Sequence, residues 1–338
     1  MKKNTGYLDL LRFLSTFLVI IMHTVSGVTD NYWQTMDPNL WTGYTIIKGL
    51  CSIAVPIFLM ISSVLFLNPD KEIPLKTLFT KYIRRIFLVI IIFGTLFVGA
   101  EMIFVFKTFN GIIIFESIRH MLIGQSWGHM WYLYMILGIY IMLPLFKLFA
   151  KHATKEIYLY TLMLLFIMNA ILPMVQSYWG YNFGIIFPVI GIYMFLFLAG
   201  FYIHTYVTHS KVLNIAAIII SIISACYIAA DVILEDTRFF YQLTYDNPFI
   251  VLFALSVFYL FSQSAKDYKI SKWFRPYLFG IYLFHAVFLN LLYKAFHILP
   301  TVLGGYILIP VFVVAVFVAT FATVWVLRLI PPVKKYLL

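Results

Sequence analysis

Long apolar runs separated by short polar connections make up almost the whole chain, and this pattern decides its fold class. A helix of about 20 apolar residues crosses a bilayer, where only helices and closed barrels satisfy every backbone group. Only 11% of the residues are charged, against about a quarter in soluble domains. The sequence predicts an all-α polytopic integral membrane helical bundle, one domain over 1–338, with about ten transmembrane helices near 7–28, 45–67, 84–106, 128–149, 157–174, 185–204, 212–234, 247–263, 276–297 and 302–330.

Lysine and arginine are distributed unevenly between the connections. With the N-terminus inside, nearly all of them fall on the cytoplasmic side, and the outer connections hold only Lys107, Arg119, Arg238 and Lys294. This bias orients membrane proteins. We therefore expect both termini to be cytoplasmic, in a multi-pass protein of the bacterial cytoplasmic (inner) membrane. The bias also explains the net charge of +11, so no nucleic-acid partner is expected.

Two further features concern the connections and the cysteines. The outer segment 107–125 contains apolar stretches that are too short to cross the membrane, and an interfacial or re-entrant helix is expected there.

Cys51 and Cys226 both lie inside apolar runs, where thiols usually act as small buried hydrophobic groups. They indicate neither a disulfide framework nor a metal site.

The first apolar run carries three ionisable side chains, Asp9, Arg12 and His23. Charges inside lipid cost several kcal/mol, so each is a functional candidate. The step of 11 residues from Arg12 to His23 is close to three helical turns, which places both on one face, with His23 roughly 16 Å nearer the outer side. The alternative is an interfacial Asp9–Arg12 ion pair and a histidine that only packs.

Other polar candidates lie in or beside later runs. Packing, interfacial aromatic belts, snorkelling charges and local hydroxyl hydrogen bonds are the alternative explanations for them. They are His285 with Tyr282 one turn before it, His129 with Trp131, Glu101 and Ser62.

A basic cluster, Lys81, Arg84 and Arg85, begins the third run on the cytoplasmic side. Positive-inside topology accounts for it adequately. The sharper hypothesis is a clamp for the phosphates of a cytosolic donor, because guanidinium groups bind phosphate bidentately.

Six stretches that span nearly the whole chain are similar to motifs of the membrane acyltransferase 3 family, the inner-membrane acyltransferases. In length the chain resembles the short stand-alone branch, that of the enterobacterial common antigen O-acetyltransferase. Two departures are Ser62–Ser63, where the family has Ser-Gly, and a displaced basic motif with Arg85 added. The stretches are 7–12 with His23, 55–62, 81–86, 129–133, 197–202 and 280–285.

This resemblance implies an O-acyltransferase that moves an acetyl or other short acyl group from cytosolic acyl-CoA to a hydroxyl of a surface polysaccharide or lipid-linked glycan. Acetyl-CoA is then a co-substrate, with no permanently bound cofactor and no metal. His23 matches the family's essential histidine, Arg12 its paired arginine, and Arg84 with Arg85 its donor-binding motif. In one route His23 is a general base and the acyl group passes directly from donor to acceptor. In the other route the acyl group is first bound covalently to the histidine.

A transporter or flippase for a glycan or an anionic solute is the rival hypothesis, because charges inside spans also line transport pathways. No internal duplication stands out, and this weakens the inverted-repeat form of that hypothesis. A receptor or scaffold has no need of such charges.

Overall fold

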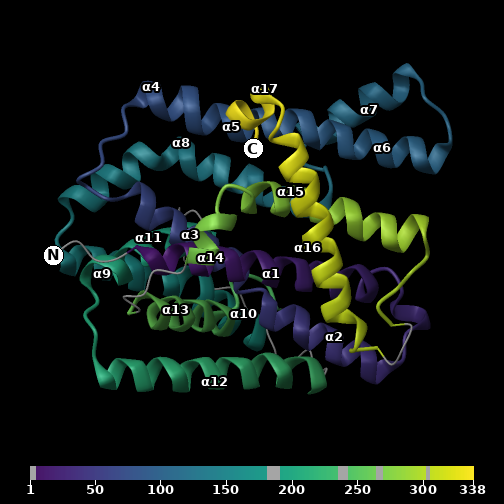
Figure 1. Ribbon diagram of the computed structural model, residues 1–338. Helices are drawn as coiled ribbons and strands as arrows, with labels where there is room; N and C mark the ends of the chain where they lie inside the picture. Colours follow the sequence, from purple (N-terminus) through teal and green to yellow (C-terminus); the bar gives the residue numbers. More distant parts are fainter. Residues whose placement is uncertain (1–4, 181–190, 235–242, 264–268, 302–304) are drawn as a thin grey trace.

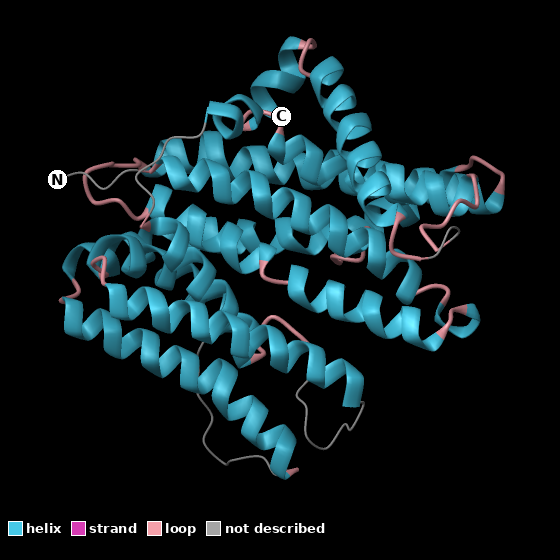
Figure 2. Cartoon of the chain, turned by 60° about the horizontal axis from the view of Figure 1, so that its bottom comes forward, coloured by secondary structure: helices cyan, strands magenta, loops and turns pink. Residues whose placement is uncertain are grey.

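The chain forms a helical bundle in a computed structural model that describes residues 5–180, 191–234, 243–263, 269–301 and 305–338. Arg238 and the first residues of the predicted runs 185–204 and 302–330 lie outside these ranges. Every regular element in the described ranges is a helix (Figure 2), which confirms the predicted all-α class.

The elements follow one another in the order labelled in Figure 1. Most are α-helices, and the short η segments are 3-10 or π turns. Their bounds are α1 Gly6–Thr29, η1 Trp33–Thr35, α2 Pro38–Cys51, α3 Ala54–Phe66, α4 Leu75–Thr77, η2 Leu78–Ile83, α5 Arg84–Val89, η3 Ile90–Gly94, α6 Thr95–Phe106, α7 Gly111–Leu122, η4 Gly128–Met130, α8 Trp131–His152, α9 Lys155–Phe166, η5 Ile167–Ile171, α10 Leu172–Trp179, α11 Gly191–Tyr206, α12 Lys211–Leu234, α13 Pro248–Ser262, α14 Lys269–Phe274, α15 Leu278–Asn290, η6 Leu291–Ala295, α16 Leu308–Leu327 and α17 Pro331–Tyr336.

Eight helical segments in the described ranges are long and apolar enough to cross a membrane, and α11 and α13 are two shorter apolar helices. Together they correspond to the ten predicted runs. The eight are Gly6–Thr29, Pro38–Phe66, Leu75–Phe106, Gly128–His152, Lys155–Trp179, Lys211–Leu234, Leu278–Ala295 and Leu308–Leu327.

Two helical segments begin earlier than the sequence predicts. The second starts at Pro38 rather than 45, where the Asp37 carboxylate accepts a hydrogen bond from the Leu40 backbone nitrogen at 3.1 Å and caps the helix. The third starts at Leu75 rather than 84, so the basic residues of 76–85 lie on its helical extension. Hydropathy marks where a chain enters lipid, whereas backbone hydrogen bonds can continue a helix into water.

Helix α1 occupies the centre of the bundle, where it contacts α2, α3, α15 and α16 (Figure 1). Helices α3 and α11 approach each other closely. A Cβ added at Gly200 would lie 2.4 Å from the Met60 Cα atom, so only glycine permits this approach. The tight packing fixes α3 beside α11, and α3 also contacts α1. In contrast, α12 lies at the edge of the bundle (Figure 1). It exposes apolar side chains on the face that points away from the other helices, as expected for a helix in contact with lipid.

Contacts between distant segments bring their basic ends to one side of the bundle. Asp9 forms an ion pair with Arg275, and the Arg85 Nε atom donates to the Leu337 carbonyl oxygen at 3.2 Å. Arg328 donates to the Pro276 carbonyl oxygen at 3.0 Å. The beginning of α1, the α5 region and the residues after α16 therefore share a side, which the positive-inside rule assigns to the cytoplasm.

Candidate functional site

Three histidines from three different elements lie together in the bundle. The ring centroids of His23 on α1 and His285 on α15 are 5.0 Å apart. His129 on η4 lies 5.2 Å from His285 and 6.4 Å from His23. His129 and His285 are fully or almost fully buried, whereas His23 is partly exposed to the cavities described below. We call these three residues the histidine cluster.

Backbone carbonyls determine which ring nitrogen carries the proton in the neutral form of two members of the cluster. The Nδ1 atom of His285 lies 2.5 Å from the Tyr282 carbonyl oxygen, and the Nε2 atom of His129 lies 3.0 Å from the Leu283 carbonyl oxygen. A carbonyl oxygen only accepts, so each of these nitrogens donates a proton. In the neutral imidazoles the other nitrogens, His285 Nε2 and His129 Nδ1, are lone-pair acceptors, and both are buried without a partner among the described residues.

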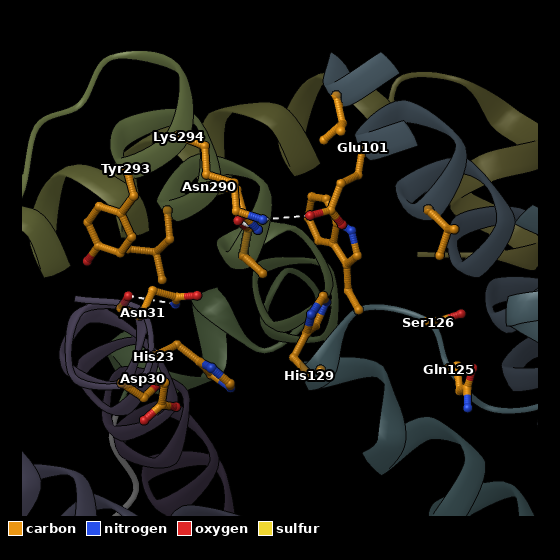
Figure 3. Close-up of a pocket in the computed structure, with 18 of the residues that line it drawn as sticks. His23, Asp30, Asn31, Glu101, Gln125, Ser126, His129, Asn290, Tyr293 and Lys294 are labelled. Atoms are coloured by element: carbon orange, nitrogen blue, oxygen red, sulfur yellow. Dashed lines mark hydrogen bonds and ion pairs between the residues drawn. The ribbon is translucent and has the colours of Figure 1, made fainter. Parts of the chain in front are cut away.

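The first outer cavity has a volume of about 670 Å³ and opens on the outer side of the histidine cluster. Figure 3 shows His23 and His129 on one side of it, opposite an ion pair between Glu101 and Lys294. The Lys294 Nζ atom lies 2.6 Å from a Glu101 carboxylate oxygen, and both side chains are partly exposed. Both residues line the cavity, so the pair belongs to its rim.

The second outer cavity has a volume of about 830 Å³ and lies on the other side of His23. Aromatic rings from three elements line it: Trp131 of α8, Tyr193 of α11 and Tyr245 of the segment before α13. The two outer cavities share four lining residues, so they meet at His23. The shared residues are His23, Ser26, Asp30 and Gly128.

The inner cavity lies on the cytoplasmic side, with a volume of about 300 Å³, and its lining includes Arg12, Arg85, Ser62 and Tyr282. Tyr282 separates this cavity from the histidine cluster. Its hydroxyl donates to the His129 carbonyl oxygen, and its ring centroid lies 5.9 Å from those of both His129 and His285. Arg12 and His23 thus face different cavities from one stripe of α1, as their spacing predicts.

A carboxylate holds Arg12 of the inner cavity in place. The Arg12 guanidinium lies 3.0 Å from one Asp9 carboxylate oxygen, and Arg275 lies 3.5 Å from the other. Asp9 is 7% exposed, so its charge is both buried and paired. Asp9 and Arg12 therefore form the ion pair that one sequence hypothesis expects, while Arg12 also lines a cavity, as the other requires.

The three basic residues of the predicted phosphate clamp occupy different positions. Arg85 lines the inner cavity and packs over the Phe279 ring. Arg84 and Lys81 are exposed and lie over the rings of Tyr336 and Tyr82. Only Arg85 thus reaches the cavity, and the other two extend the positive surface beside its entrance.

The outer segment 107–125 forms α7, as the sequence predicts, and α7 packs against α6 (Figure 1). The Asn110 side chain caps it by accepting from the Ile113 backbone nitrogen at 3.1 Å. His120 at its end and Gln125 just after it line the first outer cavity. The segment therefore forms part of the cavity wall.

The structure gathers most of the predicted site residues but separates them into two groups. His23, His129, His285, Glu101 and Trp131 belong to the outer part, and the others to the cytoplasmic part. Sequence reasoning missed the cavity-lining amides and aromatic residues. The missed residues are Asn169, Asn290, Tyr193 and Tyr245. A polar amide inside an apolar run is a usable signal, and it would have identified Asn169 and Asn290.

In the described part of the chain, no group of three or more His, Cys, Asp and Glu side chains has a geometry that could hold a metal ion. The chemically active groups that line the site include imidazole, guanidinium and hydroxyl groups. A histidine that faces a cavity, with neighbouring lone pairs, is suited to proton transfer.

Comparison with known proteins identifies the family. A family profile described as an acyltransferase domain, Acyl_transf_3, matches residues 5–329. Searches of curated proteins and of solved structures gave no match. The profile describes the family as a whole and does not separate its branches, so membership of the short stand-alone branch stays a prediction. The profile covers nearly the whole chain, including the histidine cluster and all three cavities, and the chain therefore belongs to the acyltransferase 3 family of membrane acyltransferases.

Proposed function

We propose that the chain transfers an acetyl or other short acyl group from cytosolic acyl-CoA to a hydroxyl group of a glycan on the outer side, with His23 as general base. One observation carries this proposal. An arginine-lined cavity on the cytoplasmic side and two cavities on the outer side end at opposite faces of Tyr282 and the histidine cluster. Donor and acceptor can thus approach the same imidazole from different sides of the membrane.

The donor's phosphates are anionic, and Arg85 is the basic side chain that both faces the inner cavity and lies at its cytoplasmic end. In this proposal the phosphates replace the Leu337 carbonyl oxygen as the partner of Arg85, with Arg84 and Lys81 adding positive charge nearby. The acyl arm then extends past Arg12, which Asp9 holds in position, to Tyr282.

At the histidine cluster, His23 accepts the proton of the acceptor hydroxyl, and the oxygen attacks the thioester carbonyl carbon. The C–S bond breaks, an ester forms, and the thiolate leaves as the CoA thiol after it takes up the proton. Because His285 Nε2 and His129 Nδ1 carry lone pairs, either can accept the remaining N–H of His23. Such an acceptor orients the base and stabilises its protonated form.

Thioester turnover by the purified full-length protein tests this function. Acetyl-CoA and glycan lipid extract are supplied, and both free thiol and labelled ester are measured for wild type, His23→Ala and His152→Ala. Because a general base contributes roughly 10²- to 10⁴-fold, we expect His23→Ala to lose transfer by that factor. The control, His152→Ala, changes an exposed histidine at the end of α8 and keeps wild-type rates.

The opposite outcome is equally clear. If folded wild-type protein neither binds nor consumes acetyl-CoA, the acyl-CoA reaction is wrong, and the transporter or flippase hypothesis takes its place. Movement of labelled glycan across proteoliposome membranes without acetyl-CoA then measures that alternative directly.

A further inference from the structure

The two outer cavities differ in what their walls offer to a ligand. Each has an ion pair in its wall, Glu101–Lys294 in the first and Asp30–Lys48 in the second, but the second also has three aromatic rings in mutual contact. The ring centroids of Trp131 and Tyr245 are 5.2 Å apart, those of Trp131 and Tyr193 are 5.7 Å apart, and those of Tyr193 and Tyr245 are 6.3 Å apart. All three side chains are only partly buried, so their surfaces remain accessible from the cavity.

We infer that the second outer cavity is a saccharide subsite, and that the acceptor is a sugar inside a glycan chain that lies across His23. This inference rests on the proposed function and adds the form of the acceptor. A sugar ring presents C–H hydrogens with partial positive charge, which pack well on the negative face of an aromatic ring. Its hydroxyl groups need polar partners, and Asn169 and Asp246 stand in the same wall.

Asn169 has the geometry of such a partner. Its amide nitrogen donates to the Leu165 carbonyl oxygen at 2.8 Å, and this hydrogen bond holds the side chain in place. The amide oxygen is a hydrogen-bond acceptor for a sugar hydroxyl. Aromatic faces together with a fixed amide suit a saccharide better than a lipid chain, which has no use for the amide.

The arrangement of the cavities determines where the reacting sugar lies in its chain. Both cavities reach His23, and both have volumes within the range of about 300 to 1,000 Å³ that is typical of ligand pockets. A terminal sugar needs space on only one side of the base. Space on both sides lets the chain continue in both directions while a central hydroxyl faces His23.

Acceptor length is the variable that tests this inference. Saccharides are released from the envelope glycan of the organism that makes this protein, separated by size, and supplied with labelled acetyl-CoA to wild-type protein. We expect KM for fragments of three or more sugars to be at least about tenfold lower than for single sugars, because an added stacking contact contributes roughly this factor.

Variants then locate the subsite. Trp131→Ala should raise KM for the long fragments about tenfold, while Trp131→Phe retains most of the stacking and stays near wild type. Trp33→Ala is the matched control, because Trp33 is an outer tryptophan that is 60% exposed and lines neither cavity. If Trp131→Ala does not fold, Tyr245→Ala replaces it with the same expected result.

Three results would overturn the inference while leaving acyl transfer intact. Single sugars could react as well as long fragments, Trp131→Ala could match Trp33→Ala, or the label could appear on a lipid that carries no sugar. If wild-type protein releases no thiol from acetyl-CoA, the result is different, because it contradicts the proposed function itself.

Discussion

The histidine cluster and the inner cavity differ in whether their polar groups have hydrogen-bond or ion-pair partners. In and beside the cluster, three buried nitrogen atoms have no partner within the described residues: His129 Nδ1, His285 Nε2 and Trp127 Nε1. In the inner cavity, Arg12 pairs with Asp9, and Arg85 donates to a backbone carbonyl oxygen.

An unpaired buried polar group costs about 1 to 3 kcal/mol, so a site that retains several of them has a use for them. The cluster thus keeps two fixed acceptors, His129 Nδ1 and His285 Nε2, ready for a ligand or for the His23 imidazole, and the Trp127 N–H is a donor beside them. The inner cavity instead keeps its charges paired until an anion replaces a protein partner. We interpret the first region as suited to chemistry and the second as suited to donor binding.

The sharpest way to break this comparison is to remove only one lone pair from the cluster. In His285→Gln the side-chain amide reaches the Nε2 position and restores an acceptor there, whereas in His285→Asn it reaches only the Nδ1 position. We expect His285→Asn to lower kcat about 10- to 100-fold, as befits a lost hydrogen bond to a charged group, and His285→Gln to recover part of the loss.

Steady-state rates at saturating acetyl-CoA measure this effect, with the KM for the donor as the internal control. Equal losses in the Asn and Gln variants, or a loss that appears only in the donor KM, would show that His285 only packs against its neighbours.

A change at the inner cavity should affect binding rather than chemistry. Arg85→Ala is expected to raise KM for acetyl-CoA about tenfold or more, with a smaller change in kcat, because a charge-assisted contact to phosphate is lost. Lys151→Ala removes an exposed charge at the cytoplasmic end of α8 and is the control. If kcat falls and KM does not change, the assignment of the inner cavity to donor binding is wrong.

The smallest effect is expected at the rim of the first outer cavity. The Glu101–Lys294 pair is partly exposed, with side chains that are 35% and 47% accessible, so its coupling should be about 1 kcal/mol or less. A double-mutant cycle with Glu101→Gln and Lys294→Met, followed by thermal unfolding in detergent, measures this coupling. A loss of acyl transfer above tenfold in either single variant would instead assign the pair to the acceptor site.

The local part of the site was predictable from the sequence, and the part that depends on other helices was not. The spacing of Arg12 and His23 gives their common face, because helical periodicity is a property of one segment. Glu101 illustrates the limit. As a charge in an apolar run it was a sound candidate, yet its partner Lys294 lies on η6, and no local pattern joins the two.

The sequence alone determined that this chain is a bundle of membrane helices with a basic side, because apolar length and charge bias act segment by segment. Only the tertiary structure decided that His129 and His285 meet His23, that Tyr282 separates the inner cavity from them, and that Trp131 joins aromatic residues of two other segments. The physical reason is that these contacts depend on how helices pack, such as the close approach at Gly200, and helix packing joins residues far apart in the chain.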